Sequence, residues 1–297
     1  MSNALLAYDL SDSSRFEQLN LAYDAEERTF WCEMRPDPRP CFTPTLLREI
    51  RDLPNAFRSY GIGEHDAWRS LHVVFTSATP KVFNLGGDLN FVLGAIRSQD
   101  RPGLTNYAIS CIDALYPVAT GFGLPLTTIS LVQGTALSGG MEGALATDFL
   151  IAEKGAHMGL PEVLFNLFPG MGAYSFLSRR LSPAEAERII MSGRNWTAEE
   201  LHERGLVDVL AEPGEGKIAA REFIRQRQRH AVTASAMRQV QRRTGSVSYD
   251  ELMDITMIWV DAALQLGERD LRIMERLVRA QDRMGRRVPL GPKSRLQ

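Results

Sequence analysis

The chain has 297 residues, 44% of them hydrophobic, so it can bury a large core and is not expected to be disordered. Its net charge of -2 gives no reason to expect nucleic acid or a membrane surface as a partner. Residues 1–14 lack the pattern of a secretion signal, and no stretch approaches the roughly 18 apolar residues of a membrane span. The cysteines, Cys32, Cys41 and Cys111, lack Cys-x-x-Cys spacing and are typical of free thiols rather than of a disulfide or zinc site. We therefore expect a cytoplasmic protein.

Strands and helices alternate along the first two thirds of the chain. The expected strands are 19–23, 29–34, 71–76, 126–132, 149–152 and 206–210. The expected helices are 43–57, 104–119, 142–147 and two more that begin after the capping residues Ser182 and Thr197. This alternation favours βα units with largely parallel strand pairing.

After residues 212–216, which are rich in glycine, the pattern becomes helical, with helices expected at 218–230, 233–243 and 249–284. In the last of these, an apolar stripe contains Leu252, Ile255, Trp259, Ala262, Leu266, Ile273, Leu277 and Ala280. We place a boundary near residue 214, between a core (1–214) and a helical region (215–297). The stripe must be buried on the core or on a neighbouring subunit, so we expect the helical region to close a pocket and to mediate oligomerisation.

Two glycine loops each follow an expected strand. One is Leu85-Gly86-Gly87-Asp88, and the other is Leu137-Ser138-Gly139-Gly140, at the start of a helix. Glycine lets a ligand approach the backbone closely, and a helix N-terminus offers unpaired N–H groups. Two amides that converge on one point would stabilise a developing oxyanion. Taken alone, each loop is more simply interpreted as a tight turn.

Two glutamates lie close to these loops or downstream of them. Glu142 is in the first turn of a helix of small residues, and Glu162 is flanked by Pro161 and Val163 in an apolar segment. Burial would raise the pKa of such carboxyl groups towards the range that is useful for proton transfer. The pair could therefore act as an acid and a base, or the two residues could simply cap helices or bind arginine.

The ordered set of these motifs resembles the crotonase (enoyl-CoA hydratase/isomerase) superfamily. The set comprises Gly87-Asp88, the segment from Gly134 to Glu142, Asp148, Leu160-Pro161-Glu162 and the segment from Pro169 to Gly172. The resemblance implies an α/β crotonase fold (ClpP/crotonase-like), a spiral of ββα units followed by an all-helical C-terminal segment. It also implies that Gly87 and Gly139 supply the oxyanion-hole amides and that Glu142 and Glu162 are the catalytic acid and base.

Within the superfamily, the segments 82–89, 159–176, 258–261 and 265–268 look closest to the diffusible signal factor synthases. That resemblance implies dehydration of a 3-hydroxyacyl thioester, carried by acyl carrier protein, to a cis-2-enoyl thioester. Hydrolysis would then release a cis-2-unsaturated fatty acid used in quorum sensing. Many coenzyme A-using members have a lysine two residues after the first-loop aspartate, but here the residue is Asn90. We favour Glu162 as the base at C2 and Glu142 as the acid, although the sequence leaves this division open.

An acyl chain needs an apolar pocket. The candidate substrate-binding residues are Leu85, Gly86, Met171, Tyr174, Phe176, Trp259 and Leu277. No metal or cofactor is expected. The expected partners are an acyl carrier protein or coenzyme A thioester, further copies of the chain in a homotrimer or hexamer, and a regulatory sensor kinase as a further candidate. The basic helix from Arg221 to Arg229 could bind an acidic carrier, but a solvated helix face is the simpler interpretation. The alternatives are an enoyl-CoA hydratase/isomerase of fatty acid breakdown and a non-catalytic crotonase-fold binding protein.

Overall fold

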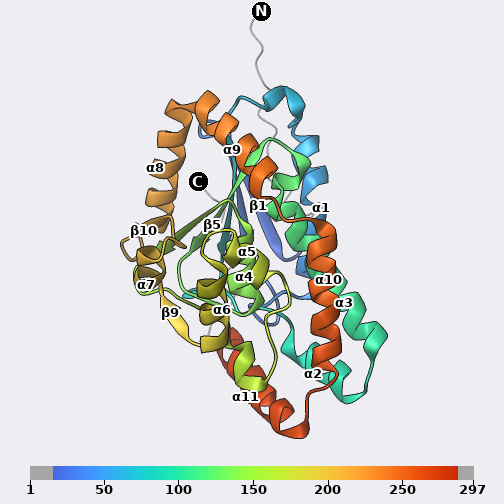
Figure 1. The fold of residues 1–297 in the computed structure, drawn as a ribbon. Helices are drawn as coiled ribbons and strands as arrows, with labels where there is room; N and C mark the ends of the chain where they lie inside the picture. The colour runs from blue at the N-terminus through green and yellow to red at the C-terminus, as the bar shows by residue number, and fades with distance from the viewer. Residues whose placement is uncertain (1–15, 287–297) are drawn as a thin grey trace, which may run out of the picture.

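The computed structural model describes residues 16–286, and Figure 1 shows their arrangement. The strands are β1 (Leu19–Asp24), β2 (Thr29–Met34), β3 (Leu71–Ser77), β4 (Val82–Asn84), β5 (Leu126–Val132), β6 (Thr135–Leu137), β7 (Phe149–Glu153), β8 (His157–Gly159), β9 (Asn195–Thr197) and β10 (Val209–Ala211). The α-helices are α1 (Pro44–Ser59), α2 (Leu89–Arg97), α3 (Arg101–Ala119), α4 (Gly139–Ala146), α5 (Ala173–Ser178), α6 (Pro183–Ser192), α7 (Ala198–Glu203), α8 (Gly216–Arg229), α9 (Ala231–Gly245), α10 (Tyr249–Ala263) and α11 (Glu268–Arg286). The expected capping residues Ser182 and Thr197 do cap α6 and α7.

The strands form two sheets. The large sheet has the order β1-β2-β3-β5-β7-β10, and all of its pairs are parallel except β1 with β2. The small sheet has the order β4-β6-β8-β9, and its first three strands are mutually parallel. The expectation of largely parallel pairing is confirmed.

The chain follows one path three times between β3 and β8. Each of β3, β5 and β7 lies in the large sheet, and the strand that follows it (β4, β6 or β8) lies in the small one. Helical segments follow each pair, which gives the expected spiral of ββα units. Because β4, β6 and β8 are parallel neighbours, their carboxyl ends lie side by side. The three loops that carry the candidate site residues begin at these ends.

The large sheet is covered on both faces. Along each buried strand, successive side chains point to opposite faces of the sheet. Trp31, Val74 and Ile129 pack towards Ala220 and Ile224 of α8. Their sequence neighbours Phe30, Val73 and Phe75 belong to the larger core, in which α1 packs on α3.

The C-terminal helices lie against the core. In Figure 1, α10 lies alongside α3, with which it packs, and α11 packs against α2 and against a short 3₁₀ helix, Pro161–Phe165. Helix α8 covers β5, β7 and β10. Its Arg221 and Arg225 form ion pairs with Glu27, and Arg221 also pairs with Asp24.

Several expected element boundaries differ from the structure, and two of the differences matter. The strand expected at 206–210 is shorter and begins at Val209. The single helix expected at 249–284 is two helices, α10 and α11, because the chain turns at residues 264–267. There the side chain of Asp270 accepts the N–H of Gly267. Within the part of the chain that the structure describes, no helix is both long enough and apolar enough to cross a bilayer.

Candidate active site

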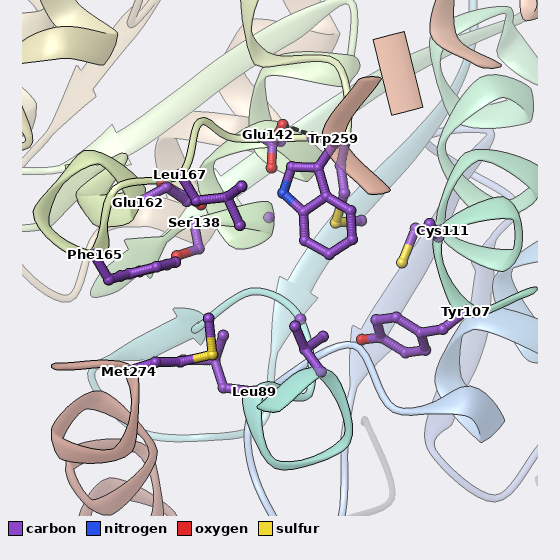
Figure 2. Close-up of a pocket in the computed structure, with 16 residues that line it drawn as sticks. Leu89, Tyr107, Cys111, Ser138, Glu142, Glu162, Phe165, Leu167, Trp259 and Met274 are labelled. Carbon is purple, nitrogen blue, oxygen red and sulfur yellow. Dashed lines mark hydrogen bonds between the residues drawn. The ribbon is translucent and has the colours of Figure 1, made fainter. Parts of the chain in front are cut away.

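Three loops at the carboxyl ends of β4, β6 and β8 form a cavity of about 60 Å³. Gly87 comes from the first loop, Gly139 and Glu142 from the second loop and the helix that it begins, and Glu162 from the third. Figure 2 shows Glu142 and Glu162 on the same side of the cavity, with Trp259 beside Glu142. The parallel register of three short strands therefore brings together residues that are as far as 75 positions apart, counted from Gly87 to Glu162 (162 − 87).

The two glycine loops approach each other very closely. A Cβ atom at Gly86 would lie 2.5 Å from the Cβ of Ser138 and 2.8 Å from the N of Gly139, and the φ of Gly86 is +92°. No residue with a side chain would fit there. A Cβ at Gly139 would lie 3.5 Å from the N of Gly87. The two amides that the sequence predicts as oxyanion donors are therefore neighbours in the cavity wall.

Glu142 is fixed in place by backbone amides. Its Oε1 accepts the N–H groups of Met171 (2.7 Å) and Ala173 (3.0 Å), and the side chain is 1% exposed. Burial, and next the nearby charge of Glu162, raise the pKa of Glu142 to about 8, although the two N–H groups oppose that shift. Glu142 is therefore a rigidly held carboxyl group whose pKa is raised by burial towards the range useful for proton transfer.

Glu162 has a different environment. It is 6% exposed and lies in the 3₁₀ helix Pro161–Phe165, and its buried Oε2 has no hydrogen-bond partner among the described residues. Burial raises its pKa to about 7, while its own backbone N–H and the hydroxyl of Ser138 lower it. An unpaired buried carboxyl oxygen is costly unless a ligand satisfies it.

The end of α4 opposite to Glu142 is held by a partly buried guanidinium, that of Arg180. Arg180 donates to the carbonyl groups of Thr147 (2.6 Å), Leu145 (3.4 Å) and Leu206 (3.2 Å). Asp148, which follows Thr147 in the chain, forms ion pairs with Arg238 and Arg242 of α9. These contacts fix the helix whose first turn carries Gly139 and Glu142.

The rest of the cavity wall is almost entirely apolar. Its side chains come from α2, α3, the segment 165–171, α10 and α11: Leu89, Val92, Ala108, Cys111, Phe165, Leu167, Met171, Trp259 and Met274. Tyr107 and Ser138 contribute the two hydroxyl groups. Across the described residues, no three His, Cys, Asp or Glu side chains are grouped so as to hold a metal ion.

Of the seven substrate-binding residues predicted from the sequence, Met171 and Trp259 line the cavity. Tyr174 does not, because α5 leads away from the site and leaves this side chain 45% exposed. Phe176 faces a second cavity beside Arg179 and Arg180. The other three are also outside the lining: Leu85 and Gly86 precede Gly87 in the same loop, and Leu277 packs against the core from α11.

Sequence reasoning missed Tyr107, Cys111, Phe165 and Met274. Each is buried, and nothing in the local sequence distinguishes it from an ordinary core residue. Ser138 carried one signal, since it precedes the predicted oxyanion glycine. Its φ of 54° is unusual for a residue with a side chain.

Comparison with known proteins shows which family the sequence matches. Residues 48–278 match the sequence profile described as Enoyl-CoA hydratase/isomerase. A carnitinyl-CoA dehydratase of Salmonella arizonae is 37% identical over 218 residues, which cover 71% of this chain and 80% of that protein. A probable mitochondrial enoyl-CoA hydratase 2 of Arabidopsis thaliana is 30% identical over 189 residues, 63% of this chain. The matched region spans only 59% of the plant protein.

Solved structures share the fold at low sequence identity. An enoyl-CoA hydratase from Bacillus halodurans superposes with a TM-score of 0.71 at 16% identity, covering 89% of this chain and 100% of its own. DspI of Pseudomonas aeruginosa superposes with a TM-score of 0.64 at 23% identity, covering 89% and 95%. These likenesses concern the fold.

Proposed function

The chain belongs to the enoyl-CoA hydratase/isomerase family, and we propose that it removes water from a 3-hydroxyacyl thioester and then hydrolyses the thioester. The observation that carries the proposal is the pairing of two buried carboxyl groups, Glu142 and Glu162, with two neighbouring backbone amides in one apolar cavity. The 37% identical relative is named a dehydratase, which supports the direction of the reaction.

The carboxyl groups divide the proton transfers. Burial raises the pKa of both carboxyl groups, so one proton can stay on the pair near neutral pH. Oε1 of Glu142 is already held by two N–H groups, whereas Oε2 of Glu162 has no partner among the described residues and can accept a proton from the substrate, so we assign the proton to Glu142 and the role of base to Glu162. Glu162 takes the C2 proton, and the electrons of the C2–H bond form an enolate whose oxygen lies against the N–H groups of Gly87 and Gly139. The enolate electrons then form the C2=C3 double bond while the C3–O bond breaks. The departing hydroxyl takes the proton of Glu142 and leaves as water.

Hydrolysis would return both carboxyl groups to their starting protonation states. After dehydration Glu142 is ionised and Glu162 is protonated. A water molecule that loses its proton to Glu142 attacks the thioester carbonyl, and the resulting oxyanion uses the same two amides. The C–S bond then breaks, the thiolate takes the proton of Glu162, and the free acid leaves. The two steps together form a closed proton cycle.

We further propose that the thioester is carried by an acyl carrier protein and that the product is a cis-2-unsaturated fatty acid signal. The support is the resemblance of residues 82–89 and 159–176 to the diffusible signal factor synthases, together with the shared fold of DspI. Mass spectrometry of the fatty acids released by a foreign host that expresses the gene tests this. A cis-2-enoic acid is expected. Its absence would refute the proposed signal product and leave only the proposal that the chain dehydrates a 3-hydroxyacyl thioester.

Deuterium exchange at C2 tests the assigned roles. In heavy water, Glu142→Gln should still exchange the C2 proton but fail to eliminate water, whereas Glu162→Gln should lose both activities. Glu153→Gln is the matched control, since Glu153 is a buried glutamate outside the cavity that accepts the N–H of Gly216. It should retain full turnover. Exchange that persists in Glu162→Gln would reverse the roles, and wild-type turnover in both site variants would refute the scheme.

An enoyl-CoA hydratase of fatty acid breakdown is the second candidate, because the family profile and the Arabidopsis relative carry that description. The same site would then run the reaction towards hydration. Rates measured with 3-hydroxyacyl-carrier protein and with the matching enoyl-CoA separate the two. A preference for the coenzyme A thioester of more than about tenfold, which is about 1.4 kcal/mol, favours the second candidate.

The trimeric or hexameric state expected from the sequence also remains a proposal. Val232, Met237 and Val240 of α9 are large apolar side chains that are at least half exposed. Burial of such side chains against another copy of the chain would stabilise an oligomer. Light scattering on the purified protein measures the mass directly, and a monomer would refute the proposal.

A further inference from the structure

We infer that Tyr107 of α3 is a positioning residue for the oxyanion site, because its hydroxyl stands between two backbone segments and fixes the orientation of the Gly87 amide. The inference rests on the proposed function and assigns a further residue to that site. Its basis is a set of hydrogen bonds around the loop that follows β4.

The segment 40–42 runs beside this loop as a short parallel pair. The N–H of Leu85 donates to the carbonyl of Pro40 (2.7 Å), and the N–H of Phe42 donates to the carbonyl of Gly86 (2.7 Å). Phe42 and Gly87 form an isolated parallel bridge. In such a ladder, the next link would run from the N–H of Asp88 to the carbonyl of Phe42.

The hydroxyl of Tyr107 binds both of these backbone groups. It accepts the N–H of Asp88 at 2.7 Å and donates to the carbonyl of Phe42 at 2.8 Å. Both backbone groups are therefore bound to one oxygen atom. The side chain thus ties the loop to segment 40–42 at the end of the short parallel bridge.

This arrangement fixes both peptide groups that flank the Cα of Gly87. The carbonyl of Gly86 and the N–H of Gly87 belong to one planar trans peptide and point in opposite directions. Because Phe42 holds that carbonyl, the N–H of Gly87 must point away from Phe42. The following peptide is held by Tyr107 through the N–H of Asp88. Glycine is otherwise the most flexible residue, so these two restraints determine where its amide points.

The position suits a fixed hydroxyl. Tyr107 is 7% exposed and lines the cavity, and a Cβ at Gly87 would lie 3.3 Å from its oxygen. Burial raises the pKa of Tyr107, so the hydroxyl stays neutral and can both donate and accept. Its ring packs on Phe91 with centroids 5.1 Å apart, a contact that phenylalanine would retain.

The test compares Tyr107→Phe with Tyr249→Phe. Tyr249 is a matched control because its hydroxyl also makes a hydrogen bond to the α3 region, donating to Asp113 at 2.8 Å. The probe is a saturated coenzyme A ketone in which a CH₂ group replaces the thioester sulfur, labelled with ¹³C at the carbonyl. It has no 3-hydroxyl to eliminate and no C–S bond to hydrolyse, so it binds without turnover. The infrared frequency of its carbonyl falls when oxyanion donors polarise it. This readout does not respond to a loss of stability alone.

We expect Tyr107→Phe to lose much of the carbonyl shift and to lower kcat by about 10- to 100-fold, with KM changed by less than about threefold, since a misplaced oxyanion donor weakens transition-state binding. Tyr249→Phe should lower Tm and leave both the carbonyl shift and kcat unchanged. If Tyr107→Phe does not fold, 3-fluorotyrosine at position 107 keeps the ring and the hydroxyl but weakens its acceptance of the Asp88 N–H. An intermediate carbonyl shift is then expected.

A wild-type carbonyl shift in Tyr107→Phe, with kcat within about twofold, would overturn the role of Tyr107 and leave the proposed function intact. A wild-type protein that binds the probe without shifting its carbonyl would overturn the oxyanion site itself. In the fluorotyrosine protein, an unchanged carbonyl shift would likewise overturn the role of Tyr107 and leave the proposed function intact.

Discussion

The indole of Trp259 lies so close to Gly170 that a Cβ atom at position 170 would be 2.3 Å from the indole Cγ. One turn earlier in α10, Thr256 donates its hydroxyl to the carbonyl of Gly170 at 3.1 Å. The residues after Gly170 supply the two amides that hold Glu142, from Met171 and Ala173. Helix α10 is therefore packed onto the segment that positions a candidate catalytic carboxyl group.

Gly170→Ala should lower the free energy of unfolding by about 1–3 kcal/mol, because the added methyl group overlaps the indole. The double variant Gly170→Ala/Trp259→Ala removes the ring and leaves only the Cβ of residue 259, 2.9 Å away, so the methyl group should then cost less than it does beside tryptophan. Urea unfolding of the four proteins measures both effects. Gly94→Ala is the control, because a Cβ at this helical position meets nothing within 4 Å, and it should stabilise α2 by about 0.5–1 kcal/mol. An equal cost of Gly170→Ala with and without Trp259 would refute the packing argument.

The two raised carboxyl pKa values predict how stability depends on pH. Glu142 and Glu162 keep protons in the folded state up to a pKa of about 8 and about 7, but lose them near 4.5 when unfolded. The folded state thus binds more protons in this range, and its stability falls as pH rises. His72 opposes this at lower pH. Burial, together with the charges of Arg227 and Arg238, lowers its pKa to about 3. Between this pKa and the unfolded value of 6.5, the unfolded state binds more protons, so His72 makes the free energy of unfolding rise with pH there.

Between pH 6.5 and 8 the carboxyl pair should therefore dominate, and the free energy of unfolding should decrease as pH rises. The double variant Glu142→Gln/Glu162→Gln should show a flatter profile over this range, because glutamine does not titrate. Urea unfolding at a series of pH values measures the slope. A slope that is equal in the wild type and in the double variant would contradict the raised pKa values.

Ser138 combines backbone strain with a contact to Glu162. Its φ of 54° lies in a region that costs a residue with a side chain about 1–3 kcal/mol, and glycine avoids this cost. Ser138→Gly should therefore be more stable than Ser138→Ala by about 1 kcal/mol or more. Both variants lose the hydroxyl that lowers the pKa of Glu162, so the acidic limb of the pH–rate profile should move to higher pH in both.

The control is Ser130→Ala, which removes a buried hydroxyl that has no hydrogen-bond partner among the described residues. Its pH–rate profile should match that of the wild type. Chemical unfolding and turnover measured across pH supply both readouts. Equal stability of Ser138→Gly and Ser138→Ala would show that the strain at this position is relieved in another way.

Most of the expected strands are confirmed. The clearest of them, such as Leu126–Val132, are runs of apolar and β-branched residues, which are typical of buried strands. The glycine loops and the two glutamates were predictable because their residue types are unusual for their positions. The break between α10 and α11 was not, since Leu264 and Leu266 continue the apolar pattern and a lone Gly267 is tolerated in helices. The carboxylate of Asp270, which accepts the N–H of Gly267, and the N–H of Leu271, which donates to the carbonyl of Gly267, mark the start of a new helix there.

The apolar wall of the site could not be predicted for a related reason. Tyr174 and Phe176 follow Ala173, whose N–H is bound to Glu142, and α5 then turns both side chains away from the cavity. Tyr107 and Met274 reach the cavity only because α3 and α11 pack where they do. Such placements depend on tertiary contacts, and helical spacing alone does not distinguish a pocket wall from a core.

Met274 gives a way to test which residues limit the acyl chain. It is fully buried, comes from α11 and lines the cavity, whose volume of about 60 Å³ holds only a few water molecules. Met274→Ala should extend this space. It should shift the preference among 3-hydroxyacyl thioesters to longer chains, at a cost of about 2–5 kcal/mol in stability. Ratios of kcat/KM along a chain-length series measure the shift. Met34→Ala, an equally buried methionine in β2 outside this cavity, should lose similar stability with no change in preference. If the two variants show the same chain-length profile, then α11 does not bound the acyl site, and the chain must leave the cavity between the other helices.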